Sequence, residues 1–139
     1  MFCAARLFHS IAQTKKNKIL LCHMMNWKEL NNEDQLDGLV AASFEKPQAI
    51  FKHSTRCYIS KTVLRKLEME WAFSVDQLDA HFLDLIAHRN ISNKIATLFS
   101  VEHESPQLIV ISKGVVIYHD SHQAIDLGEV NRTLYISVV

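Results

Sequence analysis

The sequence contains few of the residues that define special structural classes. Its 139 residues include only three glycines, two prolines and three cysteines, and 15 basic side chains are balanced by 15 acidic ones. So little glycine and proline excludes collagen-like and low-complexity chains. A formal net charge of zero leaves no basic excess for nucleic acid, and no apolar run is long enough to cross a bilayer. We therefore expect one globular domain with neither nucleic acid nor membrane as a partner.

The cysteines are too few and too irregular for a disulfide scaffold. Cys3, Cys22 and Cys57 form an odd set without regular spacing. This favours a reducing compartment over secretion, so we expect a cytoplasmic protein. The eight histidines show no paired spacing with cysteine of the kind that holds zinc, and we expect no bound metal.

Residues 1–24 lack acidic side chains, and the first carboxylate in the chain is Glu29. Three interpretations remain open: a basic targeting segment, an upstream start or tag-like addition, and a true first element. A secretory signal is excluded because the segment has no long apolar stretch with a small-residue cleavage site, but an amphipathic transit peptide fits the composition. Because Met24 and Met25 directly precede the globular-looking sequence, we favour an extension over residues 1–24 and one domain over residues 25–139.

Apolar periodicity predicts alternating helices and strands in this domain. Strands separated by helices run parallel, whereas hairpin strands run antiparallel, so the predicted fold is α/β with a mixed central sheet and helices on both faces. The last nine residues are left open, as a helical extension or a surface segment. The expected elements are a helix that starts within residues 31–34 and ends by Lys46, a strand at 49–51, a helix from Cys57 with apolar positions 59, 63, 67 and 71, a strand over 80–87 for which a helix remains open, a helix over 91–99 capped by Asn90, a three-residue hairpin connection over Ser112–Gly114, and a helix capped by Asp120 or Ser121.

Cys57 lies where the strand at 49–51 passes through a polar turn into a helix. The first turn of a helix has N–H groups without intrahelical partners and the positive end of the macrodipole, so a thiolate is stabilised there, and Arg56 acts in the same direction if it points at the sulfur. Such settings lower a cysteine pKa from about 8.5 to roughly 3.5–7.5, which mainly makes the sulfur a better leaving group. The position suits a thiol that accepts a group and then releases it. The alternative is a buried, inert cysteine.

Serine stands where a dithiol oxidoreductase has its second cysteine. Such enzymes carry Cys-x-x-Cys, whereas this sequence has Cys-Tyr-Ile-Ser over residues 57–60. A single thiol cannot close an internal disulfide, so an outside thiol must resolve its mixed disulfide. Cys3 and Cys22 are treated as bystanders because they lie in the N-terminal extension.

Three segments of the sequence resemble one known family. The order of elements, with a cysteine at the first strand-to-helix junction and a proline before the hairpin, resembles the thioredoxin fold. More closely, HSTRCYIS, LDLIAHRNISNKIA and HESPQLIVISKG resemble the monothiol bacilliredoxins, the YtxJ-like bacillithiol-system proteins. The resemblance covers roughly residues 25–127. One departure is Tyr58, where the family pattern leads us to expect a small residue or proline.

The resemblance implies a thiol-disulfide oxidoreductase that removes bacillithiol from mixed disulfides on proteins. Cys57 is then the catalytic residue, bacillithiol is a co-substrate rather than a bound cofactor, and bacillithiolated client proteins are the partners. Pro106 takes the place of the cis-proline that faces the cysteine in thioredoxin-like folds, where Ser105 can pair with a substrate backbone. The expected substrate-binding residues are His53, Thr55, Arg56, Tyr58, Ser60, Ser105 and Pro106.

Two other functions remain open. A glutathione-linked monothiol glutaredoxin is similar in chemistry, although its usual Cys-Gly-Phe-Ser is absent because Tyr58 and Ile59 replace the middle pair. A thioredoxin-fold binding module would hold a peptide and leave Cys57 inert.

Three polar residues near the cysteine or the proline also allow two interpretations. His53, four residues before Cys57, is either a donor to the thiolate or a capped or solvent-facing histidine. His103 and Glu104 either line the groove or belong to a charged loop.

Overall fold

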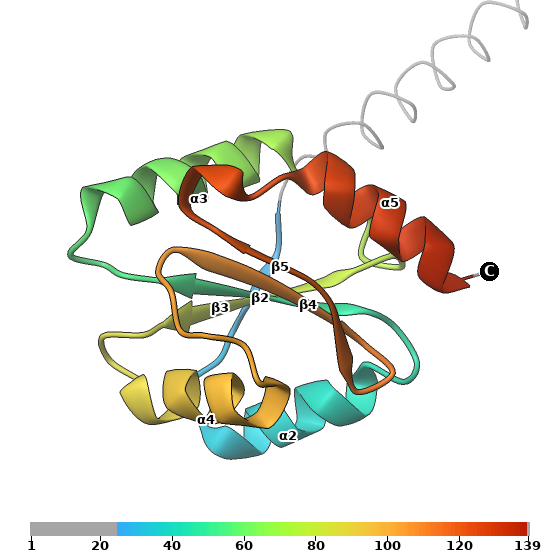
Figure 1. Ribbon diagram of the computed structural model, residues 1–139, viewed down its shortest axis with the longest axis horizontal. Coiled ribbons are helices and arrows are strands. Elements are labelled where there is room, and N and C mark those ends of the chain that lie inside the picture. The colour runs from blue at the N-terminus through green and yellow to red at the C-terminus, as the bar shows by residue number, and fades with distance from the viewer. Residues whose placement is uncertain (1–24, 139) are drawn as a thin grey trace, which may run out of the picture.

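The computed structural model, which describes residues 25–138, has a mixed sheet between two layers of helices (Figure 1). The strands in this part of the chain are β1 (Trp27–Glu29), β2 (Gln48–His53), β3 (Asp79–Asp84), β4 (Gln107–Ser112) and β5 (Val115–Ser121). They lie in the order β1-β3-β2-β4-β5. β3 is parallel to both β1 and β2, whereas β4 is antiparallel to both β2 and β5. The predicted α/β fold with a mixed sheet is confirmed.

In the described part of the chain, two helices pack on each face of the sheet (Figure 1). α2 (Glu33–Ala42) and α4 (Arg89–Phe99) cover one face, and α3 (Tyr58–Glu70) and α5 (Leu127–Val138) cover the other. A short 3-10 helix, η1 (His122–Ala124), follows β5 and contacts α3. As expected for parallel strands joined by a helix, α3 carries the chain from the end of β2 back toward the start of β3.

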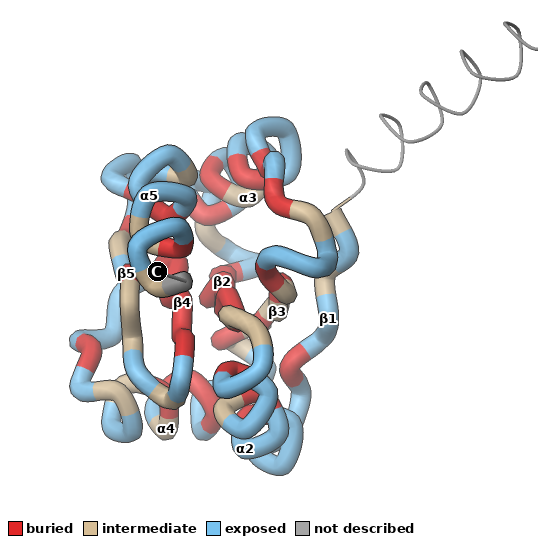
Figure 2. The backbone as a smooth tube through the Cα atoms, turned by 90° about the vertical axis from the view of Figure 1, so that its right-hand side faces the viewer, coloured by how far each residue is buried: buried red, intermediate tan, exposed pale blue. Residues whose placement is uncertain are grey.

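The sheet divides the core into two parts. Because side chains alternate along a strand, β2 directs Ala49 and Phe51 to the side of α3 and α5, and Ile50 to the side of α2 and α4. Every residue of β2 is buried, and Figure 2 shows the buried backbone concentrated in β2 and β4. A strand with neighbours on both edges and helices on both faces has little freedom, so the position at which it ends is fixed.

Several element boundaries differ from the prediction. β1 is absent from the expected elements, because three residues carry too short an alternation to indicate a strand. α2 ends at Ala42 rather than near Lys46, and the chain continues to Lys46 in hydrogen-bonded turns, in which the Glu45 and Lys46 N–H groups both donate to the Ala42 carbonyl. The strand expected over 80–87 ends at Asp84, whose carboxylate accepts from the N–H of the residue two positions on and turns the chain.

Two side chains have other roles than the sequence predicts. α4 begins at Arg89 after His88, so Asn90 is not its cap, and the Asn90 amide donates to Glu33 on α2 instead. On α3 the position expected to be buried at Ile59 is 48% exposed, and Ser60 is buried in its place. The stripe begins one residue later than predicted because Ser60, and not Ile59, lies on the inward face.

The C-terminal part of the chain forms more helix than expected. The helix predicted from Ser121 is only the single turn η1, and the segment left open forms most of α5. The predicted extension over residues 1–24, with Cys3 and Cys22, lies outside the described residues.

The hairpin between β4 and β5 turns on two residues rather than three. Lys113 (φ 52°) and Gly114 (φ 76°) both adopt the left-handed conformation that a two-residue type I′ turn requires, so the expected left-handed glycine is confirmed. Ser43 at the end of α2 holds the turn in place. Its carbonyl accepts from the Lys113 N–H at 2.7 Å, and its hydroxyl accepts from the Gly114 N–H at 2.9 Å.

We predict that Gly114→Ala lowers the free energy of unfolding by about 1 kcal/mol, because an L-residue is strained at this φ. The added Cβ would also lie 3.0 Å from the Phe44 ring. Gly38→Ala, in the interior of α2, is the matched control: its Cβ meets no atom within 4 Å, and alanine should raise the free energy of unfolding by about 0.5–1 kcal/mol. Urea unfolding measures both changes, and a stabilising Gly114→Ala would contradict the assigned turn.

Candidate functional site

Cys57 is the N-cap residue of α3, one position before the first helical turn. Its N–H donates to the Ser54 carbonyl at 3.1 Å, which closes a turn through Thr55 and Arg56, and its carbonyl accepts the first helical bond from Lys61 at 3.2 Å. The side chain makes no capping hydrogen bond. Cys57 is a free cysteine and is partly exposed. The predicted strand-to-helix junction therefore presents a thiol that solvent can reach.

Ser60 is fully buried and joins the end of β2 to the start of α3. Its hydroxyl oxygen accepts from the Ser54 N–H at 3.1 Å and lies 2.7 Å from His53 Nδ1. The hydroxyl proton needs an acceptor, and Nδ1 is the acceptor within reach, so Ser60 donates to His53. Ser60 thereby fixes the turn that precedes Cys57.

His53 is buried against α3 rather than open to the thiol. Its ring stacks on Phe51 with centroids 6.0 Å apart and lies 5.3 Å from the Phe82 ring. Burial lowers the pKa of His53, so the ring is neutral at neutral pH and carries its proton on Nε2. The hydrogen bond that the structure gives this ring goes to Ser60, and none reaches the sulfur of Cys57.

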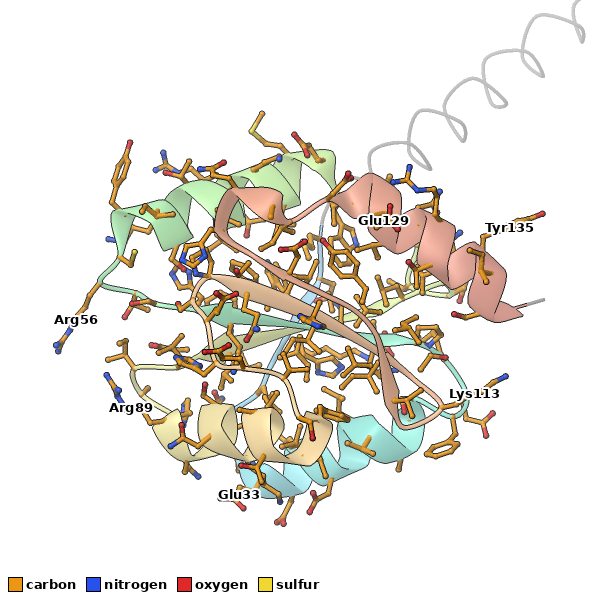
Figure 3. All side chains as sticks on the ribbon, viewed as in Figure 1. Glu33, Arg56, Arg89, Lys113, Glu129 and Tyr135 are labelled. Atoms are coloured by element: carbon orange, nitrogen blue, oxygen red, sulfur yellow. The ribbon has the colours of Figure 1, made fainter. Side chains whose placement is uncertain are left out.

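The other predicted residues around the sulfur face solvent. Thr55 and Arg56 are exposed, and the side chain of Tyr58 is 83% exposed. Arg56 projects outward from the edge of the molecule at which α3 begins (Figure 3). Cys57 is therefore preceded in the chain by an exposed cation, Arg56, and followed by an exposed aromatic ring, Tyr58.

Ser105 and Pro106 lie at the same edge of the sheet as Cys57. β4 pairs with β2 so that Gln107 is opposite Lys52, which places the preceding residues beside the end of β2. The peptide bond between Ser105 and Pro106 is cis, as expected. The Ser105 hydroxyl oxygen is buried and has no hydrogen-bond partner among the described residues.

Comparison with known protein families shows which family this chain belongs to. A family model described as the monothiol bacilliredoxin BrxC matches residues 28–130. The chain belongs to the monothiol bacilliredoxin family. The match includes Cys57, Ser60 and Pro106, so the site described above lies inside the part of the chain that defines the family.

Solved structures agree on the fold. A candidate oxidoreductase with a thioredoxin fold is 25% identical, with a TM-score of 0.65 over 76% of this chain and 90% of that one. Thioredoxin from Trypanosoma brucei brucei is 16% identical, with a TM-score of 0.62 over 82% and 92% of the two chains. Thioredoxin from Nicotiana alata is 10% identical, with a TM-score of 0.63 over 81% and 93%. This member of the family is thus a monothiol, thioredoxin-like redox protein.

Lys52 also belongs to the site of this bacilliredoxin-family protein. The sequence indicates that it lies in the polar turn after the strand, but the structure places it in the strand. Its side chain is fully buried in β2, and its Nζ lies 3.2 Å from His103 Nδ1. Burial lowers the pKa of Lys52 to about 8. The alternation of side chains along β2 could have indicated that Lys52 is buried, because Lys52 lies on the same face of the sheet as Ile50. The structure also places His103 beside Lys52, in the loop that leads to Ser105.

The described residues contain neither a cluster of metal ligands nor a membrane-spanning helix. Between residues 25 and 138, no three His, Cys, Asp or Glu side chains lie in a group that could hold a metal ion. Over the same range, no helix combines the length and the apolar character that a bilayer span requires.

We predict that Ser60→Ala lowers the free energy of unfolding by about 1–3 kcal/mol, because it leaves the buried Ser54 N–H and His53 Nδ1 without partners. Thr62→Ala on the same helix is the control. Its hydroxyl bonds the exposed Tyr58 carbonyl, so the change should stay within about 0.5 kcal/mol. Equal losses in chemical unfolding of the two variants would contradict the role given to Ser60.

We predict that the stability contributed by position 52 depends on pH. Because the folded protein lowers the Lys52 pKa from 10.5 to about 8, the unfolded chain binds more protons between these values, and the free energy of unfolding rises with pH across this interval. Lys52→Met removes this rise, which amounts to no more than about 3 kcal/mol. Urea unfolding from pH 7 to 10.5 under reducing conditions measures it. Lys66→Met, at an exposed position of α3, should keep the wild-type slope.

Proposed function

We propose that this protein is a thiol-disulfide oxidoreductase that removes bacillithiol from mixed disulfides on proteins. Bacillithiol is its co-substrate rather than a bound cofactor, and bacillithiolated proteins are its clients. The family match supports the choice of bacillithiol. The geometry that supports exchange chemistry is the free, partly exposed thiol of Cys57 at the start of α3.

The proposed reaction has two exchange steps at Cys57. In the first, the Cys57 thiolate attacks the bacillithiol sulfur of the mixed disulfide; a new S–S bond forms, and the client cysteine leaves as a thiolate and takes a proton from solvent. In the second, the thiolate of another bacillithiol attacks the bound bacillithiol sulfur and releases Cys57. The client cysteine is thereby reduced, the second bacillithiol is oxidised, and the two bacillithiol molecules leave as their disulfide.

The observation that carries the single-thiol mechanism is the burial of Ser60. In a dithiol enzyme, the residue three positions after the reactive cysteine supplies the second sulfur. Here that position is a fully buried hydroxyl bonded to Ser54 and His53. The bond between Cys57 and bacillithiol therefore persists until an outside thiol resolves it.

The remaining predicted residues have distinct proposed roles. Ser60 and His53 position the turn, whereas Thr55, Arg56 and Tyr58 form the exposed surface that a client meets. Ser105 and Pro106 provide the edge against which a substrate backbone lies, next to the end of β2. We place this exchange in the cytoplasm, where small thiols keep protein thiols reduced.

We predict that Cys57→Ser reduces turnover of a bacillithiolated model protein to the uncatalysed rate, because the nucleophilic sulfur is lost. Mass spectrometry of the model protein in the presence of excess bacillithiol measures the release. The double variant Cys3→Ser, Cys22→Ser is the matched control and should retain turnover within about twofold of wild type.

Three outcomes of this experiment would contradict the proposal. Activity that survives Cys57→Ser assigns the chemistry elsewhere. Faster release from a glutathionylated substrate by glutathione identifies a glutaredoxin. Binding of the model protein without release of either thiol identifies a binding module.

A further inference from the structure

Three basic side chains gather beside the edge that carries Cys57. Lys52 Nζ lies 3.2 Å from His103 Nδ1, and Ser92 Oγ on α4 lies 3.2 Å from the same nitrogen. Desolvation lowers the pKa of His103, and the charges of Lys52 and Arg89 lower it further. Arg89 lies in the first turn of α4, three residues before Ser92, so the two side chains share one face of the helix that contacts His103. The three residues form what we call the basic cluster: Lys52, Arg89 and His103.

The pairing of β2 with β3 brings this cluster to the same edge as the thiol. His53 lies opposite Asp84 in the parallel register, and the Leu85 N–H donates to the His53 carbonyl at 3.0 Å. The two strands thus end together, one leading to Cys57 at the start of α3 and the other to Arg89 at the start of α4. Figure 3 shows that Arg56 and Arg89 project from this same edge. Ligands of open α/β sheets bind at such edges, outside the carboxyl ends of parallel strands.

The charge of the cluster is not balanced by the protein. Within residues 25–138, four basic side chains form ion pairs, and neither Lys52 nor Arg89 is among them. The carboxylate of Glu104, the residue that follows His103, accepts a hydrogen bond from Ser121 Oγ. The first turn of α4 contains no acidic residue, whereas the first turn of α2 contains two. A buried cation without a carboxylate partner is costly, and a bound anion would offset that cost.

His103 presents a defined donor at the surface. The Lys52 ammonium can only donate, so His103 Nδ1 accepts and the ring proton is held on Nε2. His103 is exposed, so its Nε2–H is available to a ligand. The hydroxyl of Ser105, two residues further along the same loop, is a second polar group, and it has no hydrogen-bond partner within residues 25–138.

We propose that Arg89 and His103, backed by the charge of Lys52, form a subsite that binds a carboxylate of the small thiol exchanged by Cys57. This inference rests on the proposed exchange function, and it assigns recognition of a carboxylate on the small thiol to residues outside the cysteine motif. An arginine fork matches the two oxygens of a carboxylate, and a neutral imidazole N–H adds a directed bond. Arg89 is then a specificity-determining residue that sequence reasoning from the cysteine motif does not reveal.

The test measures reaction of Cys57 with three small symmetric disulfides in the full chain carrying Cys3→Ser and Cys22→Ser. The probes are dithiodipropionate, dithiodiethanol and cystamine, which are anionic, neutral and cationic. Each reaction forms the Cys57 mixed disulfide and releases one thiolate, and mass spectrometry follows it. Rates are divided by those of free N-acetylcysteine, so that only the effect of the protein remains. We expect the anionic probe to react fastest on this scale, with a preference that weakens in 0.5 M salt.

Substitution of Arg89 separates charge recognition from thiol reactivity. Arg89→Gln should lower the rate for the anionic probe about fivefold, leave the neutral probe within about twofold, and not slow the cationic probe. Arg89→Lys should retain part of the preference. Lys113→Asn removes one charge at the opposite end of the molecule (Figure 3) and should leave all three rates unchanged.

Three results would overturn the subsite. One is an anionic preference that Arg89→Gln leaves intact, and another is an equal loss with all three probes, which would mean that Arg89 acts on the thiol or the fold. The third is an Arg89 effect confined to a charge on the client. A peptide–mercaptoethanol disulfide with a carboxylate on its peptide half tests whether the basic cluster binds the client instead. If Arg89→Gln slows only this probe, the cluster recognises carboxylates of the client protein and not of the small thiol. Because these probes contain no bacillithiol, failure of bacillithiol release leaves the result interpretable.

Discussion

The in-register pairing of β2 with its neighbours is the constraint on which the reactive edge depends. β2 is buried along its whole length, with β3 and β4 on its edges and helices over both faces. The last two residues of such a strand must point to opposite faces. Lys52 consequently joins His103 on the side of α4, and His53 joins Ser60 on the side of α3. Cys57 follows a few residues later. The Lys52–His103 and His53–Ser60 contacts both restrict the path of the chain as it leaves the sheet.

The fold could be predicted from the sequence because its main elements carry a strong periodic signal. The apolar run of β2, the stripe of α3 and the β-rich segments of the hairpin each indicate one structure, and their order allows few topologies. The junction at Cys57 was also predictable, since strand, polar turn and helical spacing follow one another directly. Periodicity says nothing of Pro106. Its cis bond was expected from the family resemblance and is present in the structure, whereas its part in substrate binding stays a prediction.

The rest of the site could not be predicted because it depends on contacts between distant segments. Lys52 and Arg89 are separated in the chain by two elements, α3 and β3, and only the parallel register of β2 and β3 brings them to one edge. Asn90 has the chemistry of a helix cap, yet it bonds Glu33 because α2 lies beside α4. Ile59 fits the helical spacing as well as Ser60 does, and the packing of α3 on the sheet decided which residue faces inward.

The hydrogen bonds of Ser60 also restrict how this protein can evolve. A single base change turns a serine codon into a cysteine codon, which would restore the two-sulfur motif. A thiol is a weak donor and acceptor, however, so the same change would loosen the anchoring of the Ser54 amide and the His53 imidazole. A lineage that gained the second sulfur would have to rebuild the strand end at the same time. In the proposed exchange, the need for an outside thiol therefore has the same structural origin as the anchoring of the strand end.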